Sequence, residues 1–220
     1  MSGQNKITRR RFLGLLGGAI GAASLGCCGL AVLGTRQPGI ELQRSNCGGE
    51  AMNKVLVAYA TKAGSTGEVA EAIGQALCAG GVAAEVKPVK EVSDVSGYSG
   101  VVVGSAIRMG SWLPEAVKFV EAHTAALETI PVAYFQVSSF LKEDTPEKRQ
   151  EAATYLGAVR ALVEPVSEGL FAGKIDYSKL SFFDRTIAKM VGSAEGDWRD
   201  WDAIRAWADG LLTLGFTTSV

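Results

Sequence analysis

The stretch VLVAYATKAGSTGEVAEAI, residues 55–73, sets the expected fold. Its first five residues form an apolar run that is long enough for one buried strand and too short for a helix. Hydroxyl-bearing residues and glycines follow over 61–67, and apolar residues then recur at helical spacing, namely Val69, Ala70, Ile73 and Leu77. We therefore expect a buried strand, a short polar loop and the start of a helix.

The loop between this strand and this helix is a candidate anion site. Amides in the first turn of a helix lack helical partners and lie at the positive end of its dipole, which favours phosphate. The hydroxyls of Thr61, Ser65 and Thr66 would add donors, and Gly64 and Gly67 would let the backbone come close. The loop lacks the lysine of a P-loop and the full GxGxxG of a dinucleotide site. It suits a single terminal phosphate without a fixed cation, and the alternative is an ordinary turn that holds no ligand.

This stretch resembles the signature with which flavodoxins bind the phosphate of FMN. Seven positions match it in register: Val57, Tyr59, Thr61, Gly64, Thr66, Ala70 and Ile73. Ala58 departs, because a larger residue is usual there. The resemblance implies that FMN is the cofactor and that its phosphate binds to Thr61, Lys62, Ala63, Gly64, Ser65 and Thr66.

Further strand and helix candidates alternate along the chain. The strand candidates are 83–89, 101–104, 130–137 and 163–170, and the helix candidates are 114–127, 146–162 and 200–214. This alternation predicts an α/β domain with a parallel sheet covered on both faces. The resemblance implies a flavodoxin-like, three-layer, doubly wound sheet of five parallel strands. Ligands bind such sheets at the carboxyl ends of the strands, so the loops after the first, third and fourth strands are the candidates.

The two later loops are expected to contact the flavin ring. They contain Ser105, Ala106, Ile107, Arg108, Met109, Gly110 and Trp112 after the third strand, and Ser138, Ser139 and Phe140 after the fourth. Trp112 is the stacking candidate, with a core tryptophan as the alternative, and Met109 is a further ring contact. Phe140 would cover the other face of the ring. Arg108 would neutralise reduced flavin or hold an acidic substrate, unless it is merely solvated.

Other features are similar to the menaquinone-dependent protoporphyrinogen IX dehydrogenase branch of the flavodoxin fold. They are the third-strand loop, the run over 145–149, the stretch over 173–185 and the start of the last helix at 200–204. The resemblance covers about residues 53–214. Residues 171–196 are longer than an ordinary connection and are predicted to be an insertion. This insertion would receive a large apolar substrate, a quinone or the membrane surface, or would pack as a helix on the sheet edge.

The N-terminus carries a membrane-directing pattern. Residues 8–13, TRRRFL, resemble a twin-arginine export signal, and no charge occurs from Phe12 to Gly34. As a helix that uncharged run would span about 35 Å, against a hydrocarbon core of roughly 30 Å. Residues 1–34 are therefore expected to be an export signal or a membrane anchor, with residues 12–34 in contact with the membrane. Both alternatives place the folded domain on the outer face of the cytoplasmic membrane. Residues 35–51 are expected to be a flexible linker before a folded domain over 52–220.

Charge and composition exclude some functions. The formal net charge is −1, with the basic residues enriched near the N-terminus and a mildly acidic body, which argues against a nucleic-acid partner. No metal-ligand spacing appears among the four cysteines, and we expect a buried thiol at Cys78 and a loose one at Cys47. No acid–base pair or nucleophile stands out, and His123 is expected to be exposed. The chemistry would then belong to the cofactor.

Three functions remain open from the sequence. The first is an FMN-dependent oxidoreductase of the protoporphyrinogen dehydrogenase type that passes electrons to a membrane quinone. The second is a membrane-tethered one-electron carrier with a redox protein partner, which the export signal favours because haem precursors are handled in the cytoplasm. The third is a flavin-free binding module. An FMN-binding redox domain is the reading that the first loop favours.

Overall fold

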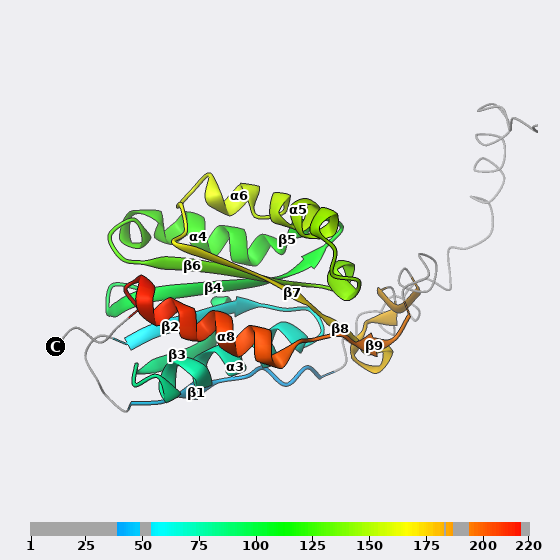
Figure 1. Ribbon diagram of the computed structural model, residues 1–220, viewed down its shortest axis with the longest axis horizontal. Coiled ribbons are helices and arrows are strands. Elements are labelled where there is room, and N and C mark those ends of the chain that lie inside the picture. The colour runs from blue at the N-terminus through cyan, green and yellow to red at the C-terminus, as the bar shows by residue number, and fades with distance from the viewer. Residues whose placement is uncertain (1–38, 49–53, 183, 187–193, 217–220) are drawn as a thin grey trace, which may run out of the picture.

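A twisted sheet runs through the middle of the molecule, with helices on both faces (Figure 1). The computed structural model describes residues 39–48, 54–182, 184–186 and 194–216. Five parallel strands lie in the order β3 (Ala84–Pro88), β2 (Lys54–Ala60), β4 (Tyr98–Arg108), β6 (Val132–Ser138) and β7 (Ser167–Ala172). Numbered along the chain, these five follow the doubly wound order 2-1-3-4-5. The predicted sheet is therefore confirmed.

Two short strands extend this sheet in antiparallel fashion. They are β1 (Ser45–Asn46), which pairs with β3, and β5 (Ser111–Trp112), which pairs with β4. A separate two-stranded ribbon consists of β8 (Lys174–Ile175) and β9 (Gly196–Asp197). Figure 1 shows the ribbon at the end of the sheet where the parallel strands terminate. The winding direction reverses between β2 and β4, and a ligand crevice is expected at that end.

The helices form the outer two layers. One face of the sheet is covered by α3 (Ser65–Ala79) and α8 (Trp201–Leu211), and the other by α4 (Pro114–Leu127), α5 (Pro146–Thr154) and α6 (Gly157–Arg160). Successive residues of a strand point to opposite faces, so β2 contributes to both cores. Val55, Val57 and Tyr59 pack in the first core, whereas Leu56 and Ala58 pack in the second.

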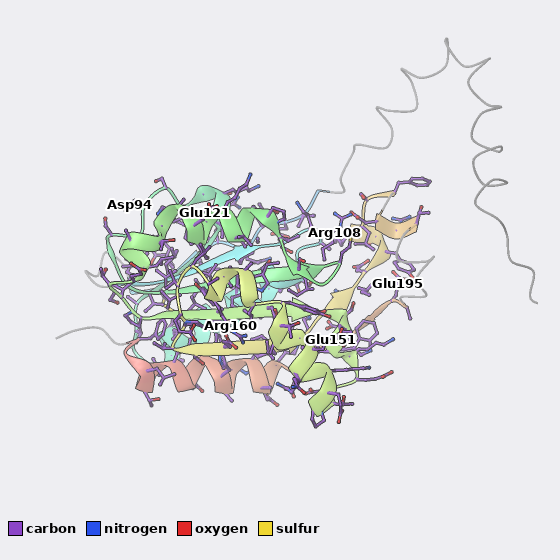
Figure 2. The ribbon with its side chains drawn as sticks, turned by 90° about the horizontal axis from the view of Figure 1, so that it is seen from above. Asp94, Arg108, Glu121, Glu151, Arg160 and Glu195 are labelled. Atoms are coloured by element: carbon purple, nitrogen blue, oxygen red, sulfur yellow. A yellow bond between two sulfur atoms is a disulfide. The ribbon has the colours of Figure 1, made fainter. Side chains whose placement is uncertain are left out.

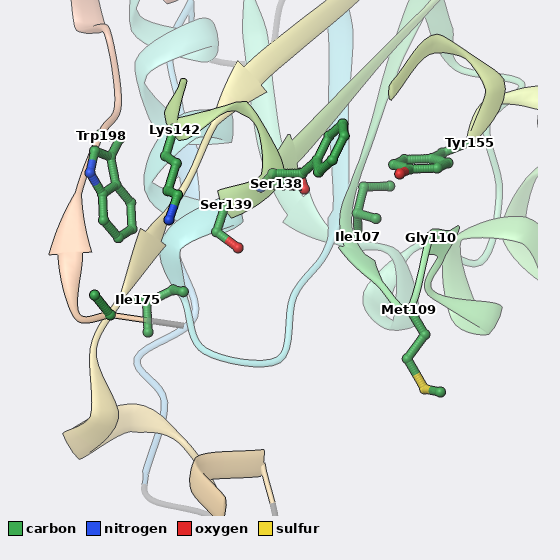
Figure 3. A pocket seen from close by; sticks show the side chains of 11 residues that line it. Ile107, Met109, Gly110, Ser138, Ser139, Lys142, Tyr155, Ile175 and Trp198 are labelled. Carbon is green, nitrogen blue, oxygen red and sulfur yellow. Dashed lines mark hydrogen bonds between the residues drawn. The ribbon is translucent and has the colours of Figure 1, made fainter. Parts of the chain in front are cut away.

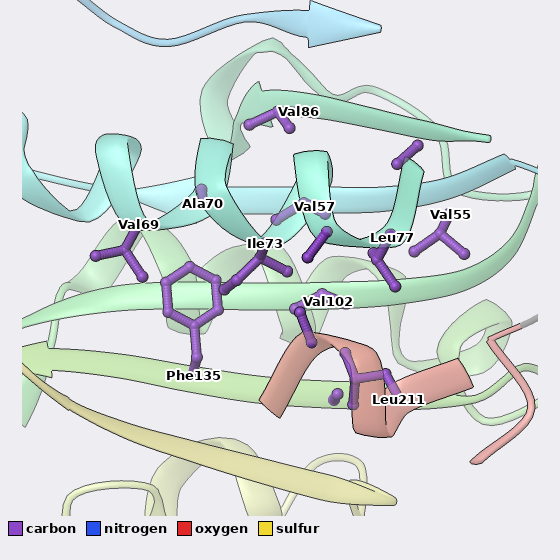
Figure 4. Packing of buried hydrophobic residues seen from close by; sticks show 14 of the residues in the cluster. Val55, Val57, Val69, Ala70, Ile73, Leu77, Val86, Val102, Phe135 and Leu211 are labelled. Atoms are coloured by element: carbon purple, nitrogen blue, oxygen red, sulfur yellow. The ribbon is translucent and has the colours of Figure 1, made fainter. Parts of the chain in front are cut away.

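Helix α3 forms as its periodicity predicts. Figure 4 shows the apolar side of the helix on the strands, and its residues Val69, Ala70, Ile73 and Leu77 are fully buried. A Cβ at Gly74 would come within 2.5 Å of Cγ2 of Val86, so a glycine at this position lets the helix lie close to β3. This packing places the N-terminus of α3 at the carboxyl end of β2.

Several boundaries differ from the sequence expectation. The strand expected at 101–104 extends over the whole of β4, and the helix expected at 146–162 is divided between α5 and α6. The expected last helix is α8 followed by a 3₁₀ turn, η4 (Leu212–Leu214). The other 3₁₀ turns are η1 (Val89–Glu91), η2 (Ser139–Lys142) and η3 (Tyr177–Lys179). Elements β8 and η3 lie within the predicted insertion over 171–196, β9 begins at its last residue, and its first two residues belong to β7.

The prediction of a flexible linker over 35–51 is wrong for residues 39–48. This segment adds strand β1 to the sheet edge. Arg44 also forms an ion pair with Glu91 of η1, with a nitrogen–oxygen distance of 2.7 Å. The polar composition of the segment is typical of a linker. Its backbone nevertheless pairs with β3, which lies far along the chain and gives no local signal in the segment itself. The folded unit therefore begins before residue 52.

The predicted states of Cys47 and Cys78 are also wrong. The two residues form a disulfide between the segment after β1 and α3, with their Cα atoms 6.2 Å apart and a sequence separation of 31. No sequence pattern indicated this pairing, because it depends on where β1 lies against β3. The bond ties the first described segment to the domain core.

The predicted export signal or anchor over residues 1–34 lies outside the described residues. Within the part of the chain that the structure describes, no helix combines the length and the apolar character needed to cross a bilayer.

Candidate cofactor site

Two adjoining cavities open at the carboxyl ends of the strands. The loop cavity, of about 370 Å³, lies against the loop after β2 and the end of β4. The aromatic cavity, of about 350 Å³, lies between the β4–β5 turn, η2 and the segment before α8 (Figure 3). The two cavities share part of their walls, namely Ile107, Met109, Ser139 and Ile175. Together they form one continuous candidate site at the position where doubly wound sheets bind ligands.

Most of the residues predicted from the sequence line these cavities. The loop cavity is lined by Thr61, Lys62, Ala63, Ser65, Ala106, Ile107, Arg108, Met109 and Ser139. The aromatic cavity adds Gly110, Ser138 and Phe140. The remaining predicted residues do not line either cavity: Gly64, Thr66, Ser105 and Trp112.

Gly64 shapes the loop that begins α3. It is the N-cap residue and has a φ of 92°, a left-handed conformation that glycine adopts without strain. Its amide donates to Oγ1 of Thr61 at 3.0 Å, and its carbonyl accepts from the amide of Gly67 at 2.9 Å. Among the described residues, no acceptor lies in hydrogen-bonding position for the amides of Ser65 and Thr66. The loop therefore presents free donors at the positive end of a helix dipole.

Thr66 provides the clearest sign that this loop holds a ligand. Its side chain is completely buried, yet its hydroxyl has no hydrogen-bond partner among the described residues. Buried polar groups are nearly always paired, so an orphaned hydroxyl at a helix N-terminus indicates a partner that binds there. A phosphate oxygen would accept from this hydroxyl and from the free amides. The loop therefore fits the phosphate of FMN.

Gly67 serves packing instead of the expected ligand approach. A Cβ at this position would lie 2.9 Å from the ring of Tyr59, which packs under the first turn of α3. Tyr59 is buried in the first core, and its hydroxyl donates to the carbonyl of Gln43 at 3.0 Å. The glycine thus lets the helix start directly above the strand that precedes it.

A tight hairpin turn carries the ring-side residues of the β4 loop. Ile107 pairs with Trp112 and Arg108 with Ser111, which leaves a two-residue turn. Both turn residues have positive φ, 52° for Met109 and 73° for the glycine that follows, as in the favoured hairpin turns. Met109 is 95% exposed at the tip of this turn and borders both cavities. The turn therefore holds an apolar side chain at the mouth of the site.

The prediction that Trp112 stacks on the flavin is wrong. Its side chain is buried in the second core, where its ring meets Tyr134 edge-on at 5.5 Å. The indole nitrogen donates to Oε1 of Gln136 at 3.1 Å, and Nε2 of Gln136 donates to the carbonyl of Ala152 at 2.7 Å. Because β5 folds back on β4, the side chain turns toward α5 and away from the crevice. The core tryptophan, left as the alternative, is the correct reading.

Ser105 is likewise a structural residue. It is completely buried, its hydroxyl donates to the carbonyl of Ala106 at 2.8 Å, and the same oxygen accepts from the amide of Leu113 at 2.9 Å. Both functions of the hydroxyl are used within the protein. The prediction that Ser105 binds the cofactor is therefore wrong.

Phe140 and Tyr155 form the aromatic wall that gives the second cavity its name. Their ring centroids are 6.2 Å apart, and Nζ of Lys148 lies 5.9 Å from the centroid of Phe140. Ser138 orders this loop, because its hydroxyl accepts from the amide of Phe140 at 3.1 Å. Burial, followed by the hydrogen bond to Glu151, raises the pKa of Tyr155. The phenol therefore stays protonated and uncharged beside the cavity.

The insertion and the segment directly after it supply wall residues that the sequence analysis did not name. Ile175 borders both cavities, Lys174 and Leu180 border the loop cavity, and Trp198 borders the aromatic cavity. The signal in the sequence was that these residues follow the fifth strand, whose carboxyl end lies at the same edge as the other loops. The contact of Trp198 with the site had no sequence signature.

Arg108 has a charged partner within the protein, in contrast to the alternative that it is merely solvated. It lies at the end of the molecule where the insertion folds back (Figure 2) and forms an ion pair with Asp184 of the insertion. Asp184 also accepts from the hydroxyl of Ser181 at 2.8 Å. The pair closes one side of the loop cavity, because both charged residues belong to its wall.

The described residues that line the two cavities include no histidine or cysteine. His123 lies on α4, half-buried with its ring 4.8 Å from that of Phe119, and was expected to be exposed. In the described ranges, no group of three or more His, Cys, Asp or Glu residues could hold a metal ion. The loop over residues 61–66, called the phosphate loop below, and the apolar wall that both cavities share suit a phosphorylated, ring-bearing cofactor. The residues present fit FMN.

Comparisons with known proteins agree with this geometry. A family described as a flavodoxin domain matches residues 56–202 of the chain. The protoporphyrinogen IX dehydrogenase [quinone] of Escherichia coli K12 is 24% identical over 175 residues, which cover 73% of this chain and 96% of that protein. The enzyme of the same name from Leishmania major is 26% identical over 179 residues, which cover 73% of this chain and 75% of that protein.

Solved structures also resemble the chain. An oxidoreductase from Corynebacterium diphtheriae is 17% identical with a TM-score of 0.49, and the match covers 77% of this chain and 100% of that one.

Proposed function

The chain belongs to the flavodoxin domain family, and from this premise we propose that it is an FMN-dependent oxidoreductase. In this proposal it oxidises a ring-shaped organic substrate and passes the electrons to a quinone. The names of the two curated relatives make protoporphyrinogen IX the first substrate to test. Bound FMN would supply hydride or single-electron transfer, and the protein would control access and orientation.

One observation carries the choice of an oxidoreductase over a simple carrier. The aromatic cavity adjoins the loop cavity and adds about 350 Å³ of space, walled by Trp198, Tyr155 and Phe140. A cofactor held by the phosphate loop does not require a second cavity of this size, whereas a ring-bearing substrate beside the flavin does. Aromatic walls on both sides would orient such a substrate by stacking.

The residues around the cavities have distinct expected roles. The amides of Ser65 and Thr66 and the hydroxyl of Thr66 would bind the phosphate. Ile107 and Ser139, which border both cavities, would contact the ring where it meets the substrate. The pair of Arg108 and Asp184 would keep the insertion closed over the loop cavity and limit the entry of water.

The test of this function uses the full chain loaded with FMN under anaerobic conditions. Protoporphyrinogen IX should bleach the flavin absorbance, and a soluble menaquinone analogue should restore it. Trp198→Ala should raise the substrate concentration needed for half-maximal bleaching without changing the affinity for FMN. Val166→Ala is the matched control, because Val166 is exposed and borders neither cavity. Reduction by dithionite but by no porphyrinogen would exclude this substrate.

A one-electron carrier is the second candidate. Met109 is 95% exposed beside both cavities, and an exposed apolar side chain next to a cofactor suits transient contact with a redox protein. A carrier should be reduced chemically in two well-separated one-electron steps, which the visible spectrum would resolve. A single two-electron step would favour the oxidoreductase.

We also propose that the domain lies on the outer face of the cytoplasmic membrane, held or exported by residues 12–34. The disulfide between Cys47 and Cys78 supports this location, because such bonds persist in oxidising compartments. Protease added to spheroplasts should degrade the domain, while a cytoplasmic marker should survive. Protection of the domain until the membrane is lysed would overturn the location.

A further inference from the structure

We propose that the insertion supplies two lysines, Lys174 and Lys179, to the phosphate of the bound flavin nucleotide. The phosphate loop itself offers hydroxyls and amides without a fixed cation, since Lys62 is paired with Glu115 at 3.0 Å. This inference rests on the proposed FMN site and names residues that would discriminate FMN from flavins without a phosphate. It also gives the insertion a role at the phosphate end of the site.

The backbone directly before Lys174 is fixed at the carboxyl ends of the parallel strands. The amide of Gly173 donates to the carbonyl of Ser138 at 3.1 Å, and its carbonyl accepts from the amide of Trp198 at 3.2 Å. A Cβ at Gly173 would come within 3.1 Å of Val137, so the strand crosses the end of β6 closely. Lys174 then borders the loop cavity together with Thr61 and Ser65.

A small recess brings the second lysine to the same place. This recess, of about 40 Å³, adjoins the loop cavity and is lined by Ala63, Ser65, Glu68, Lys174, Asp176 and Lys179. Lys174 and Ser65 border both spaces. An anion bound by the amide of Ser65 would therefore lie beside a recess that both lysines line.

Arg199 joins the ribbon of β8 and β9 to the start of α3 through two ion pairs. Its guanidinium donates to Glu68 in the first turn of α3 at 2.5 Å and to Asp197 of β9 at 2.6 Å. Only 4% of its side chain is exposed, and it stacks 4.4 Å from the ring of Trp201. Asp197 is directly opposite Lys174 in the ribbon. The phosphate loop and the strand of Lys174 are thus joined through one buried arginine, whose carboxylate partners Glu68 and Asp197 are 43% and 42% exposed.

The charges of the recess leave the lysines available. Glu68 is already paired with Arg199, and no carboxylate of the described residues lies within ion-pair distance of Lys174 or Lys179. Asp176 is the opposing charge, and its carboxylate accepts from the amide and the hydroxyl of Ser178 at 2.9 and 2.5 Å. A phosphate dianion would gain from two nearby ammonium groups and lose from this carboxylate. Loss of the lysine charges should therefore weaken phosphate binding, and loss of the Asp176 charge should strengthen it.

The experiment compares FMN with riboflavin, which lacks the phosphate, by quenching of flavin fluorescence in titrations of the full apoprotein. The double variant Lys174→Gln, Lys179→Gln should lose roughly tenfold or more in FMN affinity, with riboflavin affinity changed less than about twofold. Asp176→Asn should tighten FMN binding and leave riboflavin unchanged. The salt dependence of FMN binding should become weaker in the double variant. Lys118→Gln, an exposed lysine on α4, controls for loss of a charge elsewhere.

The outcomes separate this inference from the proposed function. A wild-type protein that binds no FMN would overturn the cofactor itself. Wild-type binding with an unchanged double variant, or an equal loss for FMN and riboflavin, would overturn the role of the lysines alone. Melting curves of the apoproteins show whether the variants are folded, and Asp176→Asn supplies a gain of affinity that misfolding cannot produce.

Discussion

Cys47, directly after β1, is bonded through its sulfur to Cys78 in the last turn of α3. The bond closes a loop with a sequence separation of 31 residues, which contains all of β2 and the phosphate loop. The first helix and the sheet edge are therefore covalently joined around the element that carries the candidate anion site.

Reduction of this disulfide should destabilise the domain. Constraint of the unfolded chain by a loop of this length is worth roughly 3–4 kcal/mol. Urea unfolding with and without dithiothreitol would measure the difference. Cys47→Ser and Cys78→Ser should each reproduce the reduced value and lose sensitivity to the reductant. A wild-type midpoint that ignores the reductant would contradict the bond.

Replacement of Thr66 by valine should weaken cofactor binding without lowering the stability of the apoprotein. The buried hydroxyl has no partner among the described residues, so valine, of the same shape, should leave the apoprotein as stable or more stable. FMN affinity should fall roughly 10- to 100-fold, because a hydrogen bond to a charged phosphate is lost. Chemical unfolding and flavin titration measure the two effects.

Thr61→Val is the contrasting variant. Oγ1 of Thr61 accepts from the amide of Gly64 within the protein, so this change should lower the stability of the apoprotein by about 1 kcal/mol. Equal losses of apoprotein stability in both variants would show that the Thr66 hydroxyl is satisfied without a ligand.

Trp112→Phe should lower the stability of the protein and leave the affinity for FMN unchanged. The change leaves the buried side-chain oxygen of Gln136 without its donor, at a cost of roughly 1–3 kcal/mol. Phe140→Leu is the comparison, since Phe140 borders the aromatic cavity and should alter the flavin spectrum. A weaker affinity for FMN in Trp112→Phe at unchanged stability would restore the stacking role that the structure contradicts.

The ion pair between Arg108 and Asp184 should hold the insertion closed. The side chains are 47% and 23% exposed, so the pair is expected to contribute less than about 1 kcal/mol. Arg108→Ala or Asp184→Ala should raise the rate of protease cleavage within the insertion roughly 2- to 5-fold. The double variant should be no faster than the single variants, because one interaction is lost in all three. Additive rates would show that the two residues act separately.

Alkaline unfolding should include a contribution from Tyr59. Burial raises its pKa from 10.0 to about 12. The stabilising contribution is fully present below pH 10 and is lost as the pH rises toward 12, because the unfolded state deprotonates first. Tyr59→Phe should show a smaller loss of stability across that window. Part of the loss of stability at alkaline pH should remain in this variant, because burial also raises the pKa values of Tyr98 and Tyr134.

The strand, loop and helix over residues 55–79 followed from the sequence because their signals are local. A buried strand needs a short apolar run, and a helix that packs on a sheet needs apolar residues at a period of 3.6. Val55, Ile73 and Leu77 satisfy those patterns and are buried as expected. The positions of the loops after β2, β4 and β6 followed from strand order, because parallel strands end at the same edge.

Side-chain directions within those loops required the tertiary structure. Trp112 is close in sequence to the cavity residues, but the β4–β5 hairpin turns it into the core against Gln136 of β6. Met109, three residues earlier, remains exposed. Which side of a strand faces a cavity depends on register and turn type, and a change of one residue reverses it.

The sequence alone determined the flavodoxin-like fold, the phosphate loop and the FMN cofactor expected there. Only the tertiary structure placed Cys47 on Cys78, Arg199 on Glu68 and Lys174 beside Ser65. Periodicity and turn chemistry act between neighbours in sequence, so they can be read along the chain. These later contacts join distant segments whose meeting depends on how the whole sheet assembles, so no local pattern contains them.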